Sequence, residues 1–138
     1  MPPTIVEVNG VNGTFAAFVG DVITRHLVNF GAHTRNELAM VLDHINDGDV
    51  VVDFGAHIGT YTIPIAKKIG PSGRLLAVEG DLTTYELLCR NVGANRLDGN
   101  VKAICEIVAA GTAQPVRRVE VKGNTGGSPI PSLSNSHE

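Results

Sequence analysis

An acidic residue and two glycines stand at the centre of the chain. Asp53 ends an apolar run that starts at Val50, and Gly55 and Gly59 follow before a helical pattern of apolar residues begins. This order predicts a buried parallel strand, a tight turn and the N-terminus of a helix. A second apolar run ends at Glu79, where an acid is placed to hydrogen-bond the two hydroxyls of a ribose. The spacing therefore predicts a site for a nucleotide-type cofactor.

The residues around the glycines help to decide which cofactor would fit. A dinucleotide fingerprint that starts at Gly55 needs further glycines where this chain has His57 and Thr60. The first of these glycines lets the backbone approach a pyrophosphate. S-adenosylmethionine has no pyrophosphate, and its ammonium and sulfonium charges suit the carboxylate of Asp53, which would repel phosphate. The pattern thus favours S-adenosylmethionine over NAD.

The segment from Asp53 to Thr62 resembles the first motif of the FkbM family of class I S-adenosylmethionine-dependent methyltransferases. The family pattern is Asp-x-Gly-Ala-Asn-x-Gly followed by an aromatic residue and a threonine, and here His57 replaces the asparagine. Glu79 matches the family's acid after the second strand, although Gly80 stands where the family usually has proline. The resemblance spans roughly residues 20–130, with further matches at Leu87-Leu88, Asn91-Val92, Asn95 and Asn124 to Ser128.

The resemblance implies that these motifs bind S-adenosylmethionine. Gly55 and Gly59 would let the turn pass close to the methionine part of the cofactor. Asp53 would face its ammonium and Glu79 would accept both ribose hydroxyls, or each acid would instead cap the next helix. His57 would act as a general base toward an acceptor hydroxyl, or replace asparagine as a hydrogen-bond donor. The expected cofactor-binding residues are Asp53, Gly55, Ala56, His57, Gly59, Tyr61, Thr62, Glu79 and Gly80.

The resemblance also implies an acceptor and an incomplete fold. In the family the methyl acceptor is often a hydroxyl on a sugar or natural product, so a small hydroxyl-bearing molecule is the expected substrate. The family's later Asp-Val-Glu-Gly motif is absent from the chain. We therefore expect either a truncated piece or a chain whose acceptor-binding half is supplied by a homo-oligomer or a complementing chain. A cofactor-binding fragment without catalysis is the alternative function.

Composition narrows the class of protein. With 138 residues, 43% of them hydrophobic, the chain is long enough for one domain with a core. The net charge of -3 gives no basic field, so neither nucleic acid nor an anionic membrane is expected as a partner. The N-terminus lacks the basic and apolar regions of a signal peptide, which predicts a cytoplasmic location. Cys89 and Cys105 are expected to be buried free thiols, and the five scattered histidines predict no metal site.

The N-terminal 48 residues predict a β-rich segment followed by helices. Runs at 4–8 and 14–19, punctuated by Asn-Gly pairs, predict a hairpin beside the main sheet. Asp21 is placed to cap a helix that ends at Gly31 and turns Val22, Ile23, Leu27 and Val28 inward. Thr34 to Glu37 forms a capping-box pattern before a helix that ends at Gly48, with Leu38, Val41, Leu42 and Ile45 on its buried face.

Residues 49–122 predict the cofactor-binding core, an α/β Rossmann-like parallel sheet with flanking helices. Strands are expected at 50–53 and 74–79 and from Val101 to about 108, with helices at 59–69 and after Asp81. A further half-exposed strand is expected at 116–121 and a Gly/Ser/Pro-rich loop or tail at 123–138. The second helix is expected to bury Tyr85, Leu88, Cys89 and Val92.

Overall fold

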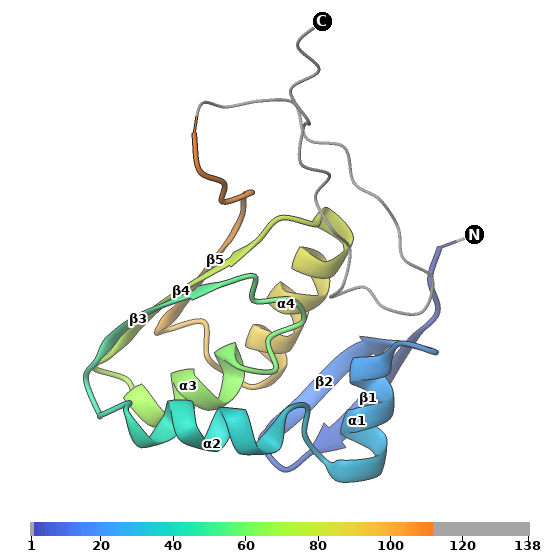
Figure 1. Cartoon of the computed structure of the whole chain (residues 1–138), viewed down its shortest axis with the longest axis horizontal. Helices are drawn as coiled ribbons and strands as arrows, with labels where there is room; N and C mark the ends of the chain where they lie inside the picture. Colours follow the sequence, from blue (N-terminus) through green and yellow to red (C-terminus); the bar gives the residue numbers. More distant parts are fainter. Residues whose placement is uncertain (1, 112–138) are drawn as a thin grey trace, which may run out of the picture.

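The computed structural model describes residues 2–111, which form a two-stranded antiparallel sheet and a three-stranded parallel sheet joined by helices (Figure 1). The parallel strands lie in the order β3-β4-β5, with a helix between each consecutive pair. This confirms the α/β Rossmann-like fold. The elements in chain order are β1 (Ile5–Gly10), β2 (Gly13–Phe18), α1 (Val22–Phe30), α2 (Arg35–Asp43), β3 (Val50–Phe54), α3 (Thr62–Ile69), β4 (Arg74–Glu79), α4 (Leu82–Ala94) and β5 (Val101–Cys105).

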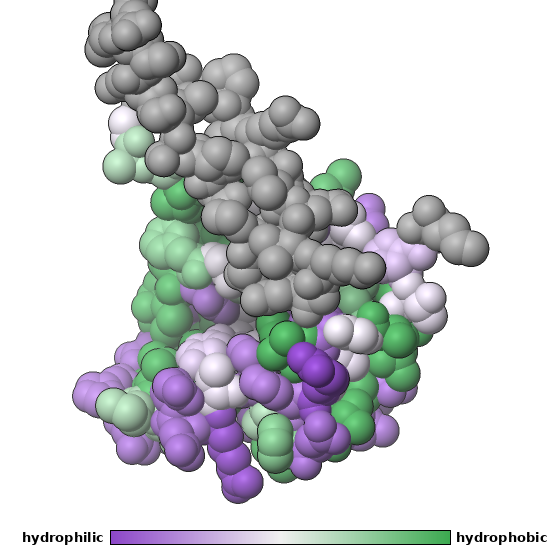
Figure 2. Space-filling view, turned by 45° about the vertical axis from the view of Figure 1, so that its right-hand side comes forward, coloured by the Kyte–Doolittle hydropathy of each residue, from purple (hydrophilic) through white to green (hydrophobic). Residues whose placement is uncertain are grey.

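The two crossover helices lie on one face of the parallel sheet. Helix α3 packs on β4, and α4 packs on β4 and β5. Both crossovers step in the same direction across the sheet, and crossovers of one hand then place their helices on the same side. On the other side of β3, Val50, Val52 and Phe54 are 80%, 46% and 65% exposed. Figure 2 shows hydrophobic surface along the left of the molecule, the side on which the parallel sheet lies in Figure 1.

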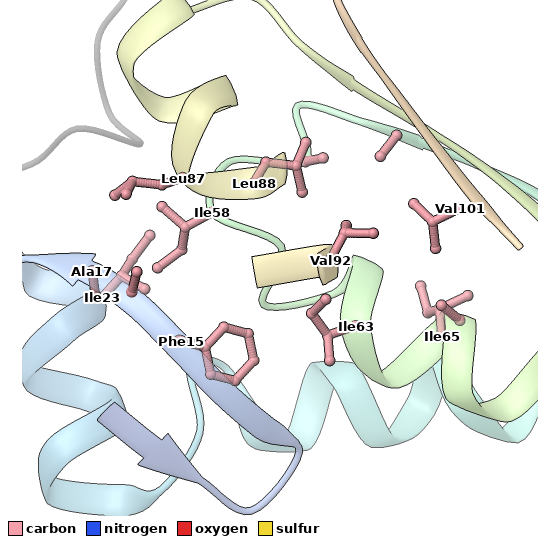
Figure 3. Packing of buried hydrophobic residues seen from close by; sticks show 14 of the residues in the cluster. Phe15, Ala17, Ile23, Ile58, Ile63, Ile65, Leu87, Leu88, Val92 and Val101 are labelled. Carbon is pink, nitrogen blue, oxygen red and sulfur yellow. The ribbon is translucent and has the colours of Figure 1, made fainter. Parts of the chain in front are cut away.

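One core joins the hairpin to the parallel sheet. Phe15 of β2, Ile63 of α3 and Leu88 of α4 are at most 1% exposed, and Phe15 and Ile63 lie next to each other (Figure 3). Ile58, from the loop after β3, is buried as well and lies between β2 and α4, beside Leu87 (Figure 3). The predicted hairpin is confirmed: β1 and β2 form a sheet of their own, separate from the parallel sheet, and β2 packs against α4. The N-terminal hairpin and the loop of residues 55–61, where the cofactor is expected to bind (the cofactor loop), therefore pack around the same buried side chains.

Helix α1 follows the prediction except on one side. The Asp21 carboxylate accepts the Ile23 N–H at 2.7 Å, and Gly31 ends the helix with φ 72°. Leu27 is buried as expected, but Val28 is 63% exposed, so its predicted inward position was wrong. The hydrophobic pattern could not separate these neighbours, since both are apolar and only one faces β1 and β2.

Several predicted features of the other helices were wrong. Thr34 makes no cap bond to α2, because its hydroxyl lies 2.8 Å from the Tyr61 hydroxyl, and α2 ends at Asp43 instead of Gly48. On α4, Cys89 is exposed and Tyr85 is half-buried. The buried face of α4 is rotated toward residues that the pattern treated as outward, and it comprises Thr84, Leu87, Leu88, Asn91 and Val92.

The strand limits differ from the predictions only at their ends. Strand β4 has the predicted bounds, β3 is longer by Phe54, and α3 starts at Thr62 because the loop continues past Gly59. Strand β5 ends at Cys105, a free and exposed thiol, so the predicted buried position and the extension to 108 were wrong. The strand expected at 116–121 and the tail at 123–138 lie outside the described residues. Within residues 2–111, no helix could span a membrane and no three His, Cys, Asp or Glu side chains gather as a metal site requires.

Candidate functional site

The loop between β3 and α3 is fastened to the end of β4. The N–H groups of Gly55 and Ala56 both donate to the Val78 carbonyl, at 2.8 and 3.0 Å. Gly55 and Gly59 have φ angles of 75° and 94°, which an L side chain rarely adopts. The Gly59 N–H donates to the Ala56 carbonyl at 2.9 Å and closes the turn. The two predicted glycines are therefore required by the path of the backbone.

Glu79 lies at the tip of β4, where its carboxylate holds two loops together. One oxygen accepts the His57 N–H and the other accepts the Asp81 N–H, each at 2.8 Å. The cap of α4 is Asp81, whose carboxylate accepts the Thr84 N–H at 2.9 Å, so Glu79 is not the helix cap. A carboxylate has about four lone-pair sites, of which two are used here. The remaining acceptor capacity is fixed in orientation at the carboxyl ends of the parallel strands.

Asp53 lies at the end of β3 beside the same loop. Its carboxylate accepts the Thr62 hydroxyl at 2.6 Å. Burial raises the pKa of Asp53, and the nearby Glu79 carboxylate raises it further, while the Thr62 hydrogen bond opposes both effects. A carboxylate in this setting is stabilised in its charged form by a cation. Asp53 therefore has the surroundings of a cation-binding group, and it accepts from a hydroxyl rather than capping α3.

His57 occupies the turn in a left-handed backbone conformation, with φ 53°. Burial lowers the pKa of His57, and the nearby carboxylates of Asp21, Glu79 and Asp81 raise it in part. The imidazole is thus mainly neutral near pH 7. The general-base and hydrogen-bond roles both require a bound ligand, so they stay predictions.

The glycines differ in what surrounds them. A Cβ placed on Gly55 would meet no atom of residues 2–111 within 4 Å, whereas one on Gly59 would lie 3.1 Å from a methyl of Leu88. A Cβ on Gly80 would lie 2.9 Å from Ile107, so the space beside Gly80 is filled by the chain itself. Open space beside a strained glycine is what a closely approaching ligand requires. Gly55 has this property and Gly59 and Gly80 do not.

The other predicted residues pack in the core or hold the loop in place through hydrogen bonds. Ala56 is buried in the core, and Thr62 is buried and bonded to Asp53. The Tyr61 hydroxyl bonds to Thr34, so the loop is tied to the start of α2. Neither this contact nor the role of Asn91, whose side chain donates to the Ile58 carbonyl at 2.8 Å, was predicted from the sequence. Asn91 had a sequence signal, because it belongs to the asparagine motif noted after Glu79.

Taken together, these groups match S-adenosylmethionine in charge and in hydrogen-bonding capacity. Asp53 offers a carboxylate for a cationic group, and Glu79 offers acceptor capacity for a diol one strand away. The two strands are neighbours in register, with Asp53 opposite Ala77 and Phe54 opposite Val78. Ligands of open α/β sheets bind at this carboxyl edge. The second-strand acid and the open glycine thus lie where the sequence predicted them.

Comparisons with known proteins assign the family. Residues 9–119 match the model of the TRM5/TYW2 methyltransferase domain. A curated relative from Methanocaldococcus jannaschii, tRNA(Phe) (4-demethylwyosine(37)-C(7)) aminocarboxypropyltransferase, is 38% identical over 61 residues, which cover 44% of this chain and 24% of the relative.

Solved structures agree. M. jannaschii TYW2 in complex with AdoMet is 28% identical with a TM-score of 0.60, covering 77% of this chain and 45% of that one. M. jannaschii Trm5 in complex with adenosine has a TM-score of 0.57 at 18% identity, covering 77% of this chain and 31% of that one, and it supports the fold alone. The chain therefore spans about a quarter of the curated relative and less than half of these structures.

The methyltransferase class expected from the sequence is supported, but the FkbM assignment is not. The motifs used for that assignment, the acid and glycines of the first loop and the acid after the next strand, all lie around the expected cofactor site. Cofactor-binding residues recur across families that act on different acceptors, so these motifs could not distinguish one family from another. Because the matching family model covers most of its length, the chain belongs to the TRM5/TYW2 methyltransferase domain family.

Proposed function

We propose that this chain is the S-adenosylmethionine-binding part of a transferase that modifies tRNA. The match to the TRM5/TYW2 methyltransferase domain carries this proposal, because the matched residues include the whole loop from Gly55 to Thr62 and also Glu79. The solved TYW2 relative is a complex with AdoMet, and the curated relative is named for a tRNA substrate. Both relatives support the proposal by similarity, and the positions of Asp53, Glu79 and Gly55 support its cofactor-binding part.

In this function the chain binds and orients the cofactor. Asp53 holds the ammonium, Glu79 accepts from the ribose hydroxyls, and the open side of Gly55 receives the methionine part. When bound, S-adenosylmethionine supplies an activated carbon next to a sulfonium. The fixed backbone of the loop keeps these groups in place, so that little reorganisation is needed during transfer.

The proposed acceptor replaces the one expected from the sequence. A small hydroxyl-bearing acceptor and the absence of a nucleic acid partner were inferred from the FkbM resemblance and from the net charge. The relatives' names conflict with both inferences. Net charge is a weak guide here, because this chain spans less than half of the solved relatives, so its net charge is not comparable with theirs. The expected cytoplasmic location stays a prediction.

Calorimetric titration of the full chain with S-adenosylhomocysteine, and separately with NAD, tests the cofactor assignment. We expect binding of S-adenosylhomocysteine and no comparable binding of NAD. Equal affinities for the two would overturn the assignment. Binding of S-adenosylhomocysteine without any transfer would support the alternative of a cofactor-binding fragment.

The transferred group and the acceptor need a separate experiment. The family is named for methyl transfer, whereas the curated relative is named for aminocarboxypropyl transfer. We propose methyl transfer, and S-adenosylmethionine labelled either in the methyl group or in the carboxyl carbon distinguishes the two. Methyl label in tRNA supports the proposal, carboxyl label in tRNA shows the other transfer, and methyl label in small hydroxylated compounds alone contradicts the tRNA acceptor.

A further inference from the structure

Two asparagines, Asn91 in α4 and Asn95 at its C-cap, form hydrogen bonds along the outer edge of β2. Asn91 accepts the Ala16 N–H at 2.6 Å and donates to the Ala16 carbonyl at 3.0 Å. Asn95 accepts the Thr14 N–H at 3.1 Å and donates to the Thr14 carbonyl at 2.7 Å. A side-chain amide has the donor and acceptor of a peptide group, so each asparagine replaces one residue of a neighbouring strand. The edge of β2 is thereby satisfied by a helix.

Only one of the two asparagines also reaches the cofactor loop. The second hydrogen of the Asn91 amide is donated to the Ile58 carbonyl at 2.8 Å. The corresponding hydrogen of Asn95 is donated to the Asn91 carbonyl of its own helix at 2.8 Å. The orientation of the Asn91 amide is fixed, because its oxygen must face the Ala16 N–H while its nitrogen faces two carbonyls.

The contact to Ile58 lies at the most constrained part of the loop. Ile58 stands between His57 and Gly59, which both have positive φ angles. The Ile58 side chain is 1% exposed and packs between β2 and α4 (Figure 3). On its other side, the start of the loop is bonded to β4, since Gly55 and Ala56 donate to Val78 and His57 donates to Glu79. Asn91 therefore holds the loop from the helix side, and it does so with an amide that also holds the N-terminal hairpin.

We propose that Asn91 is a positioning residue, which sets the conformation of the cofactor loop and couples it to the N-terminal hairpin. This inference rests on the proposed function only where it predicts ligand affinity. Loss of the Asn91 side chain leaves the Ile58 carbonyl, the Ala16 carbonyl and the Ala16 N–H without this partner in the core. Loss of the Asn95 side chain affects the same hairpin but not the loop, so Asn95→Ala is the matched control.

Hydrogen exchange of the ligand-free full chain provides the first test. In Asn91→Ala, the backbone amides of residues 55–61 should exchange at least about tenfold faster than in wild type, the factor that one lost hydrogen bond corresponds to. In Asn95→Ala, this segment should exchange at the wild-type rate while the hairpin loses protection. Equal exchange of the loop in the two variants would overturn the proposal.

Ligand affinity provides the second test, and it is independent of stability. The loop is placed to contact the methionine part of the cofactor, whereas Glu79 contacts the ribose. Asn91→Ala should therefore weaken binding of S-adenosylhomocysteine about tenfold. It should weaken 5′-methylthioadenosine, which lacks the amino-acid part, distinctly less. An equal loss for both ligands would indicate only a general loss of structure and would contradict a positioning role.

Two further measurements keep the outcome decisive. If Asn91→Ala does not fold, Asn91→Ser offers a smaller defect. Nuclear magnetic resonance of the wild type needs no variant at all: the side-chain NH2 protons of Asn91 should exchange much more slowly than those of the exposed Asn36. Similar rates for the two would overturn the proposal. If wild type does not bind S-adenosylhomocysteine, the proposed function fails while the exchange measurements still decide the role of Asn91.

Discussion

Replacing Glu79 by glutamine tests the most specific geometric feature of the site. The two carboxylate oxygens each accept a backbone N–H, one from His57 and one from Asp81. The glutamine amide keeps one acceptor oxygen but turns an NH2 group toward the second N–H. A hydrogen bond to a charged group contributes about 1.5–3 kcal/mol, and the half-buried position of Glu79 favours the lower end. We therefore expect Glu79→Gln to lower the free energy of unfolding by about 1.5–2 kcal/mol.

Urea unfolding of the full chain at pH 7, with and without S-adenosylhomocysteine, measures this effect. Glu86→Gln on the exposed side of α4 makes the same change in net charge and should shift the free energy of unfolding by less than about 0.5 kcal/mol. The affinity for S-adenosylhomocysteine should fall at least about tenfold in Glu79→Gln and stay unchanged in Glu86→Gln. If the two variants are indistinguishable in stability and affinity, Glu79 neither fastens the loops nor binds the ribose.

Three further predictions follow from the site and the sheet. Both Gly55→Ala and Gly59→Ala should cost about 1–2 kcal/mol of backbone strain in thermal or urea unfolding, with a larger loss for the closely packed Gly59, whereas only Gly55→Ala should weaken S-adenosylhomocysteine binding out of proportion to its stability. His57→Asn should keep the fold, since asparagine tolerates a positive φ. Because burial lowers the pKa of His57 in the folded state, the free energy of unfolding of the wild type should fall as the pH drops below about 6.5, and that of His57→Asn should fall less over the same range. The full chain should self-associate in light scattering through the exposed face and edge of β3, and Val52→Lys should reduce this, so an equally associated variant would contradict the assignment of that surface.

The parts of the fold that sequence patterns predicted are those governed by neighbours in the chain. Strand β4 was predicted with its observed bounds because its apolar run starts after a turn rich in glycine and proline and ends at an acid. The cap of α1 by Asp21 was predicted because it involves residues two positions apart. The cap of α2 was wrong because the Thr34 hydroxyl has a competing partner in Tyr61, 27 residues away. A local pattern contains no information about such a contact.

The candidate site shows the same division. Asp53 and Glu79 end two consecutive parallel strands, and the sequence pattern predicted an acid at the end of each, so both lie at the carboxyl edge of the sheet. The buried position of Asn91 was not predicted, because a polar side chain is usually exposed. It is buried here because all its hydrogen bonds are satisfied by segments 33 and 75 residues away. The family was misassigned for a related reason: the motifs that could be recognised in the sequence are those expected around the cofactor, not those that bind the acceptor.

The hydrogen bonds between α4 and β2 also determine when the hairpin can fold during synthesis of the protein. Ala16 and Asn91 are 75 residues apart, so at about 5–20 residues per second the ribosome needs about 4–15 s to make the second after the first. During that interval the hairpin exists as a nascent segment whose outer edge lacks the amide groups that later satisfy it. A two-stranded hairpin alone is only marginally stable in water. The N-terminal hairpin therefore acquires its final structure only when α4 emerges, and the same event fixes the cofactor loop.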